Sequence, residues 1–322
     1  MHCEYTDRYG YVDGMRRSPA TALLAVLLVV CWSSGFVGAT LSTQVVPFDT
    51  ALAWRTIVSA GVLAVIALLR GERVSLADAR RQLPLGLLVQ VVYLGGVFAA
   101  AEAGVPTGTV ALIAALQPLL VAGLAGRVTG TSPTPRQLAG LLLGAAGVGL
   151  VVAGDLGTGA APAAAFLLPV LAVAGLAAGT LLEGRWRPTT PLVSSLALQS
   201  GVAAVVFAAV AAGRGHLAPP PTAHFWWAVA WLVGLAALGG YGSYLLTVRR
   251  SGPTFASALL YLTPPTTALW AWAMFGQVPG PLAAPGAVVC AAGIGLFAGR
   301  RRRAVVRSRP AVPSPRAAVP SH

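Results

Sequence analysis

Ionisable side chains are rare within the apolar segments of this 322-residue chain, and Arg55 is the one full charge placed well inside such a segment. An arginine at membrane depth is costly, so it usually faces a cavity or a partner charge. The sequence leaves two interpretations open. Either Arg55 attracts an anionic group of a ligand or fixes a gate, or it is structural and pairs with Asp49 or Glu102 or extends to the lipid headgroups.

Tyrosine, glutamine and tryptophan supply most of the other polar groups in these segments. Gln90 and Tyr93 lie three residues apart, as do Tyr241 and Tyr244, so each pair shares one face of a helix. Polar side chains in lipid turn toward the protein interior, where they line a cavity or bond to a neighbouring helix. The predicted cavity residues are Trp32, Arg55, Gln90, Tyr93, Gln117, Gln199, Tyr241, Tyr244 and Tyr261.

Prolines interrupt two of the most apolar segments. Pro118 lies in "ALIAALQPLL" (111–120), and Pro264 and Pro265 lie in "SALLYLTPPT" (257–266). Proline lacks an N–H and clashes with the carbonyl four residues back, so it bends a helix and frees a carbonyl group. In hydrocarbon, free carbonyls are tolerated where they face protein or cavity water. We therefore predict helix kinks, with a gating role, on either side of a central cavity.

The sequence offers little for catalysis, metal binding or nucleotide binding. The four histidines fall in predicted loops or tails, and the three cysteines show no C-x-x-C spacing. A phosphate-binding loop needs a lysine, and the chain has none. We expect no catalytic residue, no metal site, no cofactor and no enzyme. The net charge of +13 comes from arginines at the ends of apolar segments and in the tails, which argues against a nucleic-acid partner.

The composition indicates an all-α integral membrane protein. Hydrophobic residues make up 56% of the chain and charged residues only 10%, whereas soluble domains are about 25% charged. A transmembrane helix needs about 20 mainly apolar residues. Ten segments qualify, namely 20–40, 50–69, 83–101, 107–126, 137–153, 162–182, 191–212, 225–247, 254–275 and 281–299.

The arginines mark one side of the membrane. They occupy both tails and every second loop, while the alternate loops hold only Arg214. Basic loops stay in the cytoplasm, so we predict a multi-pass protein of the cell membrane with both termini cytoplasmic. Residues 1–19 form the N-terminal tail, in which Met15 is an alternative start. Residues 300–322 form a basic, disordered tail that would attract anionic lipid.

Three matches at nearly constant spacing relate the two halves of the chain. The aligned ranges are 45–71 with 189–215, 106–118 with 253–265, and 145–150 with 291–296. The offsets of 144, 147 and 146 residues place five predicted spans in each copy. Because five is odd, the second copy crosses the membrane in the opposite sense. The copies then form an inverted repeat, as in many secondary transporters.

These segments resemble the EamA-type ten-helix transporters of the drug/metabolite transporter superfamily. The resemblance rests on "WSSGFVGA" (32–39), "WRTIVSAG" (54–61), "PTGTVALIAALQPLLVA" (106–122) and "SGPTFASALLYLTPP" (251–265). The resemblance implies two inverted five-helix repeats, at 20–153 and 162–299, around a central cavity. It also implies a transporter that moves amino acids, other metabolites or xenobiotics, usually outward. Arg55 matches the family's span-two arginine. The first span departs from the family, because "WSSGF" stands where a Gly-Asn pair is commoner.

Residues and resemblance together predict a secondary transporter that exports small molecules by alternating access. One alternative is a membrane-embedded enzyme, which would need convergent His, Asp, Glu or Cys side chains. The other is a membrane scaffold or sensor that transports nothing. Substrate, direction and coupling ion are not encoded in these residues, and the sequence is compatible with a homo-oligomer.

Reporter fusions test the predicted topology. A C-terminal alkaline phosphatase should be inactive, because that enzyme needs its disulfides and the cytoplasm is reducing. A fusion inside the loop that contains Arg214 should be active, because that loop is predicted to lie outside the cytoplasm, and it serves as the positive control. An active C-terminal fusion would place that terminus outside and overturn the topology.

Overall fold

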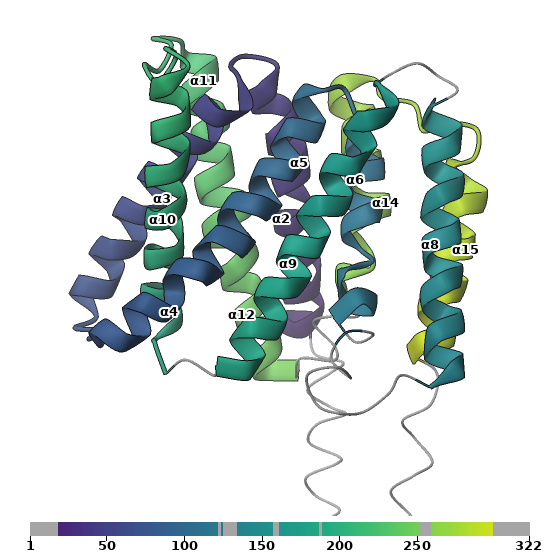
Figure 1. Ribbon diagram of the computed structural model, residues 1–322, viewed down its shortest axis with the longest axis horizontal. Coiled ribbons are helices and arrows are strands. Elements are labelled where there is room, and N and C mark those ends of the chain that lie inside the picture. The colour runs from purple at the N-terminus through teal and green to yellow at the C-terminus, as the bar shows by residue number, and fades with distance from the viewer. Residues whose placement is uncertain are drawn as a thin grey trace, which may run out of the picture.

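The computed structural model describes residues 19–121, 124, 134–156, 161–186, 189–251 and 259–298. These residues form helices joined by short turns, with no strand among them (Figure 1). Except for Pro19, which begins the first helix, the predicted tails lie outside the described residues, Met15 included. So do the start of the predicted ninth span and part of the connection between the fourth and fifth spans.

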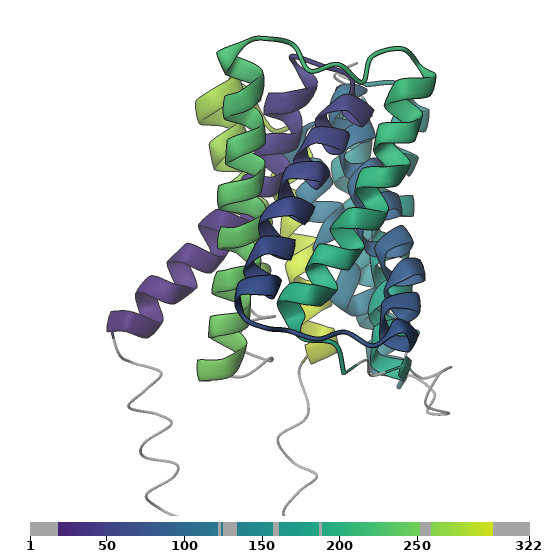
Figure 2. The same ribbon diagram turned by 90° about the vertical axis from the view of Figure 1, so that its left-hand side faces the viewer.

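The helices stand side by side as an upright bundle (Figure 2). The first half supplies α2 (Pro19–Thr43), α3 (Phe48–Leu69), α4 (Leu76–Gly86), η1 (Leu87–Val92), α5 (Tyr93–Glu102), α6 (Thr107–Ala114) and α8 (Pro135–Leu156). The second half supplies η2 (Ala163–Phe166), α9 (Leu167–Trp186), α10 (Leu192–Gly213), α11 (Ala223–Trp231), η3 (Leu232–Gly240), α12 (Tyr241–Ser251), α14 (Thr263–Phe275) and α15 (Ala283–Ala298).

Seven helical stretches in the described part of the chain have the length and apolar composition of a membrane-crossing helix. They coincide with the predicted spans one to three and five to eight. The other three predicted spans hold shorter helices, namely Thr107–Val121 in the fourth, α14 in the ninth and α15 in the tenth. The all-helical membrane architecture is therefore confirmed, and a set of ten crossings stays a prediction.

A two-residue turn interrupts each proline-containing segment. Helix α6 ends at Ala114, and Pro118 lies in the first turn of the helix that resumes after a two-residue turn. Helix α14 also follows a two-residue turn and carries Pro264 and Pro265 in its first turn. Proline suits a first turn because the N–H groups there have no partner within the helix. The structure thus has a short turn at each predicted kink, in which Ala115 and Leu262 keep right-handed helical backbone angles, and a gating role stays a prediction.

Two π-helical segments occupy corresponding places in the two halves. Segment η1 joins α4 to α5, and segment η3 joins α11 to α12. η3 begins at Leu232, 145 residues after η1 begins at Leu87. A π-helical turn is rare and is frequent at functional sites, because its extra residue changes which way the following side chains point.

Helices of the first half pack against helices of the second half. Helix α3 lies beside α10, α6 beside α14, and α8 beside α15 (Figures 1 and 2). Helix α2 packs on η3 and α12, while α9, which holds the same place in the second half, packs on η1 and α5. The main apolar core forms where α2, α3 and α5 meet α10 and α11. The centre of the molecule is therefore built from both halves.

Glycines bring α8 and α15 into backbone contact. A Cβ atom on Gly147 would lie 2.6 Å from the Cys290 nitrogen and 2.7 Å from the Gly286 carbonyl oxygen. A Cβ atom on Gly293 would lie 2.6 Å from the Gly144 nitrogen. Small residues allow this close approach, which is a common way to pair helices in lipid.

Replacing Gly147 by alanine should destabilise the purified protein by about 1–3 kcal/mol, because the new methyl group would overlap backbone atoms that cannot rotate away. Gly149→Ala is the matched control, since a Cβ atom at Gly149 meets nothing within 4 Å. Thermal unfolding in detergent measures the difference. Equal melting temperatures for the two variants would contradict the close contact.

Candidate functional site

Arg55 is buried near the start of α3, with 7% of its surface exposed. Its guanidinium lies 5.7 Å from the ring centre of Phe98, and its Nε and Nη1 atoms have no hydrogen-bond partner. The ion pairs of the described residues do not include Arg55. Buried donors are almost always satisfied in folded proteins. The unused donors of Arg55 therefore mark a place where a ligand or water supplies the acceptor.

Arg55 borders a space at the contact between the two halves. This space has a volume of about 60 Å³, and Trp32, Tyr93 and Tyr241 line it together with Arg55. A neighbouring space of about 50 Å³ shares Trp32 and Tyr93. We call these spaces together the central cavity. Its walls come from both repeats.

The central cavity extends in two directions. On one side Gln117, Pro118 and Tyr261 line the second space, and on the other Ser59 and Gln90 line a smaller pocket of about 20 Å³ that also touches the arginine. The hydroxyl of Ser59 is buried without a hydrogen-bond partner. Among the described lining residues of all three spaces, the arginine is the only charged side chain. The cavity thus offers one cation within walls of aromatic, apolar and uncharged polar side chains.

The π-helical segments aim two tyrosines into this cavity. Tyr93 is the first residue after η1, and Tyr241 is the first residue after η3. Trp32 from α2 packs against Tyr241 and Tyr244, with ring centres 5.6 Å apart in each pair. Two of the aromatic residues beside Arg55, Tyr93 and Tyr241, therefore directly follow π-helical segments, one in each half.

Three of the predicted cavity residues bond or stack elsewhere. Gln199 donates from Nε2 to Oε1 of Gln82 at 2.8 Å, so its amide joins two helices and does not line the central cavity. Tyr244 packs behind Trp32 and lines none of the three spaces. Gln117 lines the cavity and also donates to Thr180 Oγ1 at 3.1 Å. Hydrogen bonding between helices, the alternative stated above, accounts for Gln199 and partly for Gln117.

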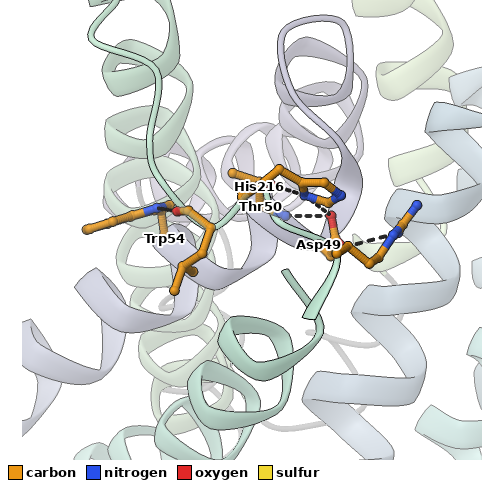
Figure 3. Close-up of polar contacts among 6 residues, drawn as sticks. Asp49, Thr50, Trp54 and His216 are labelled. Carbon is orange, nitrogen blue, oxygen red and sulfur yellow. Dashed lines mark hydrogen bonds and ion pairs between the residues drawn. The ribbon is translucent and has the colours of Figure 1, made fainter. Parts of the chain in front are cut away.

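Asp49 is fully buried at the start of α3 and bonds to the connection after α10 (Figure 3). Its Oδ2 accepts a hydrogen bond from Arg214 Nη1 at 3.0 Å, and its Oδ1 lies 3.4 Å from His216 Nδ1. The hydroxyl of Thr50 donates to the His216 carbonyl oxygen at 2.8 Å, and Trp54 Nε1 donates to a carbonyl in the same connection. This cluster fastens α3 to the end of α10.

One alternative for Arg55, a pairing with Asp49 or Glu102, does not occur among the described ion pairs. Asp49 pairs with Arg214, which stands half exposed on the opposing helix end. Glu102 is exposed at the end of α5, and no ion pair joins it to a described residue. The sequence suggested both carboxylates because they lie near the same face. Separation along the chain does not reveal which arginine lies next to the Asp49 carboxylate in the folded protein.

A second fastening joins the same two helices at their other ends. Glu72 Oε2 accepts hydrogen bonds from the Ser194 hydroxyl at 2.6 Å and from the Ser194 nitrogen at 3.1 Å. Sequence reasoning did not identify it, although the repeat alignment contains the signal. The offset of 144 residues places Ser194 on Thr50 and His216 on Glu72. The helix ends are shaped alike too, since Gly71 and Gly215 both have positive φ, 63° and 81°.

Asp155 is a further buried carboxylate that sequence reasoning missed. It lies at the end of α8, is 2% exposed, and bonds to the hydroxyl of Thr109 on α6. The predicted fifth span stopped at residue 153, so this aspartate fell into the next connection. Its place in "VAGDLG", directly after an apolar run, was the available signal.

Comparison with known proteins identifies a family for both halves. Residues 19–153 and residues 163–299 each match the EamA-like transporter family. A relative from Streptantibioticus cattleyicolor, described as a probable terminal-alkyne amino-acid exporter, is 28% identical over 215 residues. That match covers 65% of this chain and 71% of the relative.

A solved crystal structure is similar in fold. It superimposes with a TM-score of 0.57 at 21% identity, covering 87% of this chain and 97% of the other. At this identity the likeness concerns the fold alone. The shared arrangement extends across nearly the whole of the solved chain.

Replacing Arg55 by methionine should leave the ligand-free protein equally stable or stabilise it by about 1–4 kcal/mol, because an apolar chain of similar length removes a poorly satisfied buried charge. Arg214→Met is the matched control and should lower the melting temperature, since it strips buried Asp49 of its cation. A loss of stability in Arg55→Met as large as in the control would show that Arg55 has a structural partner.

Proposed function

Because the chain belongs to the EamA-like transporter family, we propose that it exports small organic solutes, amino acids among them, by alternating access through the central cavity. The observation that carries this proposal is the buried Arg55 guanidinium, whose Nε and Nη1 atoms have no partner at the contact of the two halves. The relative described as an amino-acid exporter supports the solute class.

The proposed chemistry is electrostatic and reversible. A carboxylate that enters the cavity would accept hydrogen bonds from Arg55, and such charge-assisted bonds are about twice as strong as neutral ones. The aromatic side chains of Trp32, Tyr93 and Tyr241 would exclude water around that pair. Gln90, Gln117 and Tyr261 would complete the lining as the solute moves.

We further propose that the two halves are inverted five-helix repeats, at 20–153 and 162–299. The sequence matches, the equivalent π-helical segments, the equivalent proline breaks and the reciprocal packing of α2 and α9 all support this arrangement. In such transporters the two halves exchange conformations around a site near the middle of the membrane. The breaks before Pro118 and Pro265 would then act as paired gates.

The proposed orientation has both termini in the cytoplasm of a cell-membrane protein. It is supported by the arginines, because α3, α9 and α12 end with them on one side while Arg214 follows α10 on the other. The basic tail at 300–322 would then lie against anionic lipid on the cytoplasmic face. Association into a homo-oligomer is compatible with this arrangement.

An enzymatic role has less support. Catalysis of acyl or phosphoryl transfer needs converging nucleophiles, acids or metal ligands. The described residues hold no group of three or more His, Cys, Asp or Glu side chains placed to bind a metal ion. The residues that line the central cavity fit binding and release better than bond breaking.

Solute flux into proteoliposomes tests the proposal. The wild-type chain should exchange radiolabelled amino acids, and Arg55→Ala should reduce the flux about ten- to a hundredfold, because it removes hydrogen bonds to a charged group. Arg250→Ala, at an exposed position at the end of α12, should transport normally and is the matched control. Equal flux in the wild type and Arg55→Ala would exclude Arg55 from the solute site.

A further inference from the structure

A larger cavity lies beside the central one, and its lining residues come mainly from α6 and α14 on one side and α8 and α15 on the other. Figure 1 shows where these four helices stand in the bundle. We call it the lateral cavity. Its volume is about 470 Å³, whereas the main spaces of the central cavity measure about 50 and 60 Å³. Ligand sites usually measure about 300–1,000 Å³, and the lateral cavity falls in that range.

The lateral cavity suits hydrocarbon. Alanines of α14 and α15 form much of its wall, and their small side chains leave space that larger ones would fill. No charged side chain occurs among its described lining residues. Two of its few polar side chains are already engaged. The hydroxyl of Thr109 bonds to Asp155, and Oε1 of Gln277 accepts a hydrogen bond from the Thr107 nitrogen at 3.0 Å.

The two cavities are neighbours that share lining residues at the two-residue turns. Ala115 and Tyr261 line both the central and the lateral cavity. Both residues lie in the two-residue turns that interrupt the proline-containing segments, so turn residues form the shared wall of the two cavities there. Pro264 and Pro265 line the lateral side of this junction. An extended molecule could therefore occupy the polar and the apolar space at once.

We propose that the exported solutes are carboxylates with an unbranched apolar chain, whose carboxylate binds Arg55 and whose chain passes Tyr261 into the lateral cavity. This inference rests on the proposed function and adds the substrate class. Charge complementarity favours a solute over a membrane lipid as the occupant. The headgroup of a phospholipid stays at the membrane surface, whereas the unpaired guanidinium of Arg55 is buried inside the bundle.

The proposal predicts a steep dependence on chain length. Suitable probes are straight-chain 2-amino carboxylates with side chains of one to eight carbons. Each added methylene group that enters the lateral cavity should tighten binding about three- to fourfold, until the chain fills the space. Binding is measured as a ligand-induced shift in the melting temperature of the full chain in detergent, and transport as counterflow in proteoliposomes.

Cavity-filling variants locate the chain. Ala287→Leu and Ala291→Leu add bulk to the α15 wall of the lateral cavity, while Ala292→Leu is the matched control, exposed on the same helix and outside the lining. We expect both filling variants to weaken binding of the eight-carbon probe at least tenfold. Binding and flux of the one-carbon probe, alanine, should change less than twofold. The control should behave as the wild type with both probes.

The outcomes separate this inference from the proposed function. Alanine flux that depends on Arg55, without any gain from longer chains, would overturn the inference alone. Phospholipid that copurifies with the wild type and is lost from Ala287→Leu, with unchanged binding of the long probe, would make the lateral cavity a lipid site and also overturn it. Chain-length-dependent binding without flux would support the assigned binding of the carboxylate and its chain and contradict the proposed export. If no probe binds and no probe is transported, both the inference and the proposed function are contradicted.

Discussion

The structure depends on one costly arrangement, a guanidinium buried among aromatic rings with two nitrogen atoms left without acceptors. A fold loses free energy by holding Arg55 in that state, since the charge is removed from water and only partly compensated. The contact with the ring of Phe98 offsets a part of this cost. Binding of an anionic group would offset the rest. In the proposed function, an unfavourable resting state of this kind would make binding selective for solutes that carry the missing acceptor.

The surrounding helices hold the two halves together around this candidate site, and both halves contribute to its lining. Helices α3 and α10 are fastened at both ends, by Asp49 with Arg214 and by Glu72 with Ser194. Between these ends, the π-helical segments turn Tyr93 and Tyr241 toward the arginine. The two halves are alike in backbone but differ in chemistry. The alignment places neutral Gln199 where the first half has Arg55, so only one half supplies the cation.

The sequence predicts the helical membrane architecture and the core of the site, because both depend on the contrast between polar and apolar residues. Trp32, Arg55, Tyr93 and Tyr241 are conspicuous in their segments, and the structure brings these four around one space. A π-helical turn leaves no comparable signal, since it changes the backbone register and not the composition. Distant pairing is hidden as well. Gln199 looked like a cavity residue, yet its partner Gln82 lies 117 positions away along the chain.

The most direct measurement is an experimental structure of the full chain in lipid with a bromine-labelled 2-amino carboxylate, so that the solute can be oriented without ambiguity. The account predicts the carboxylate within hydrogen-bond distance of Arg55 Nε or Nη1, in the space bordered by Trp32 and Tyr241. A solute bound elsewhere, with those two nitrogen atoms still unpaired or bonded to protein, would contradict it.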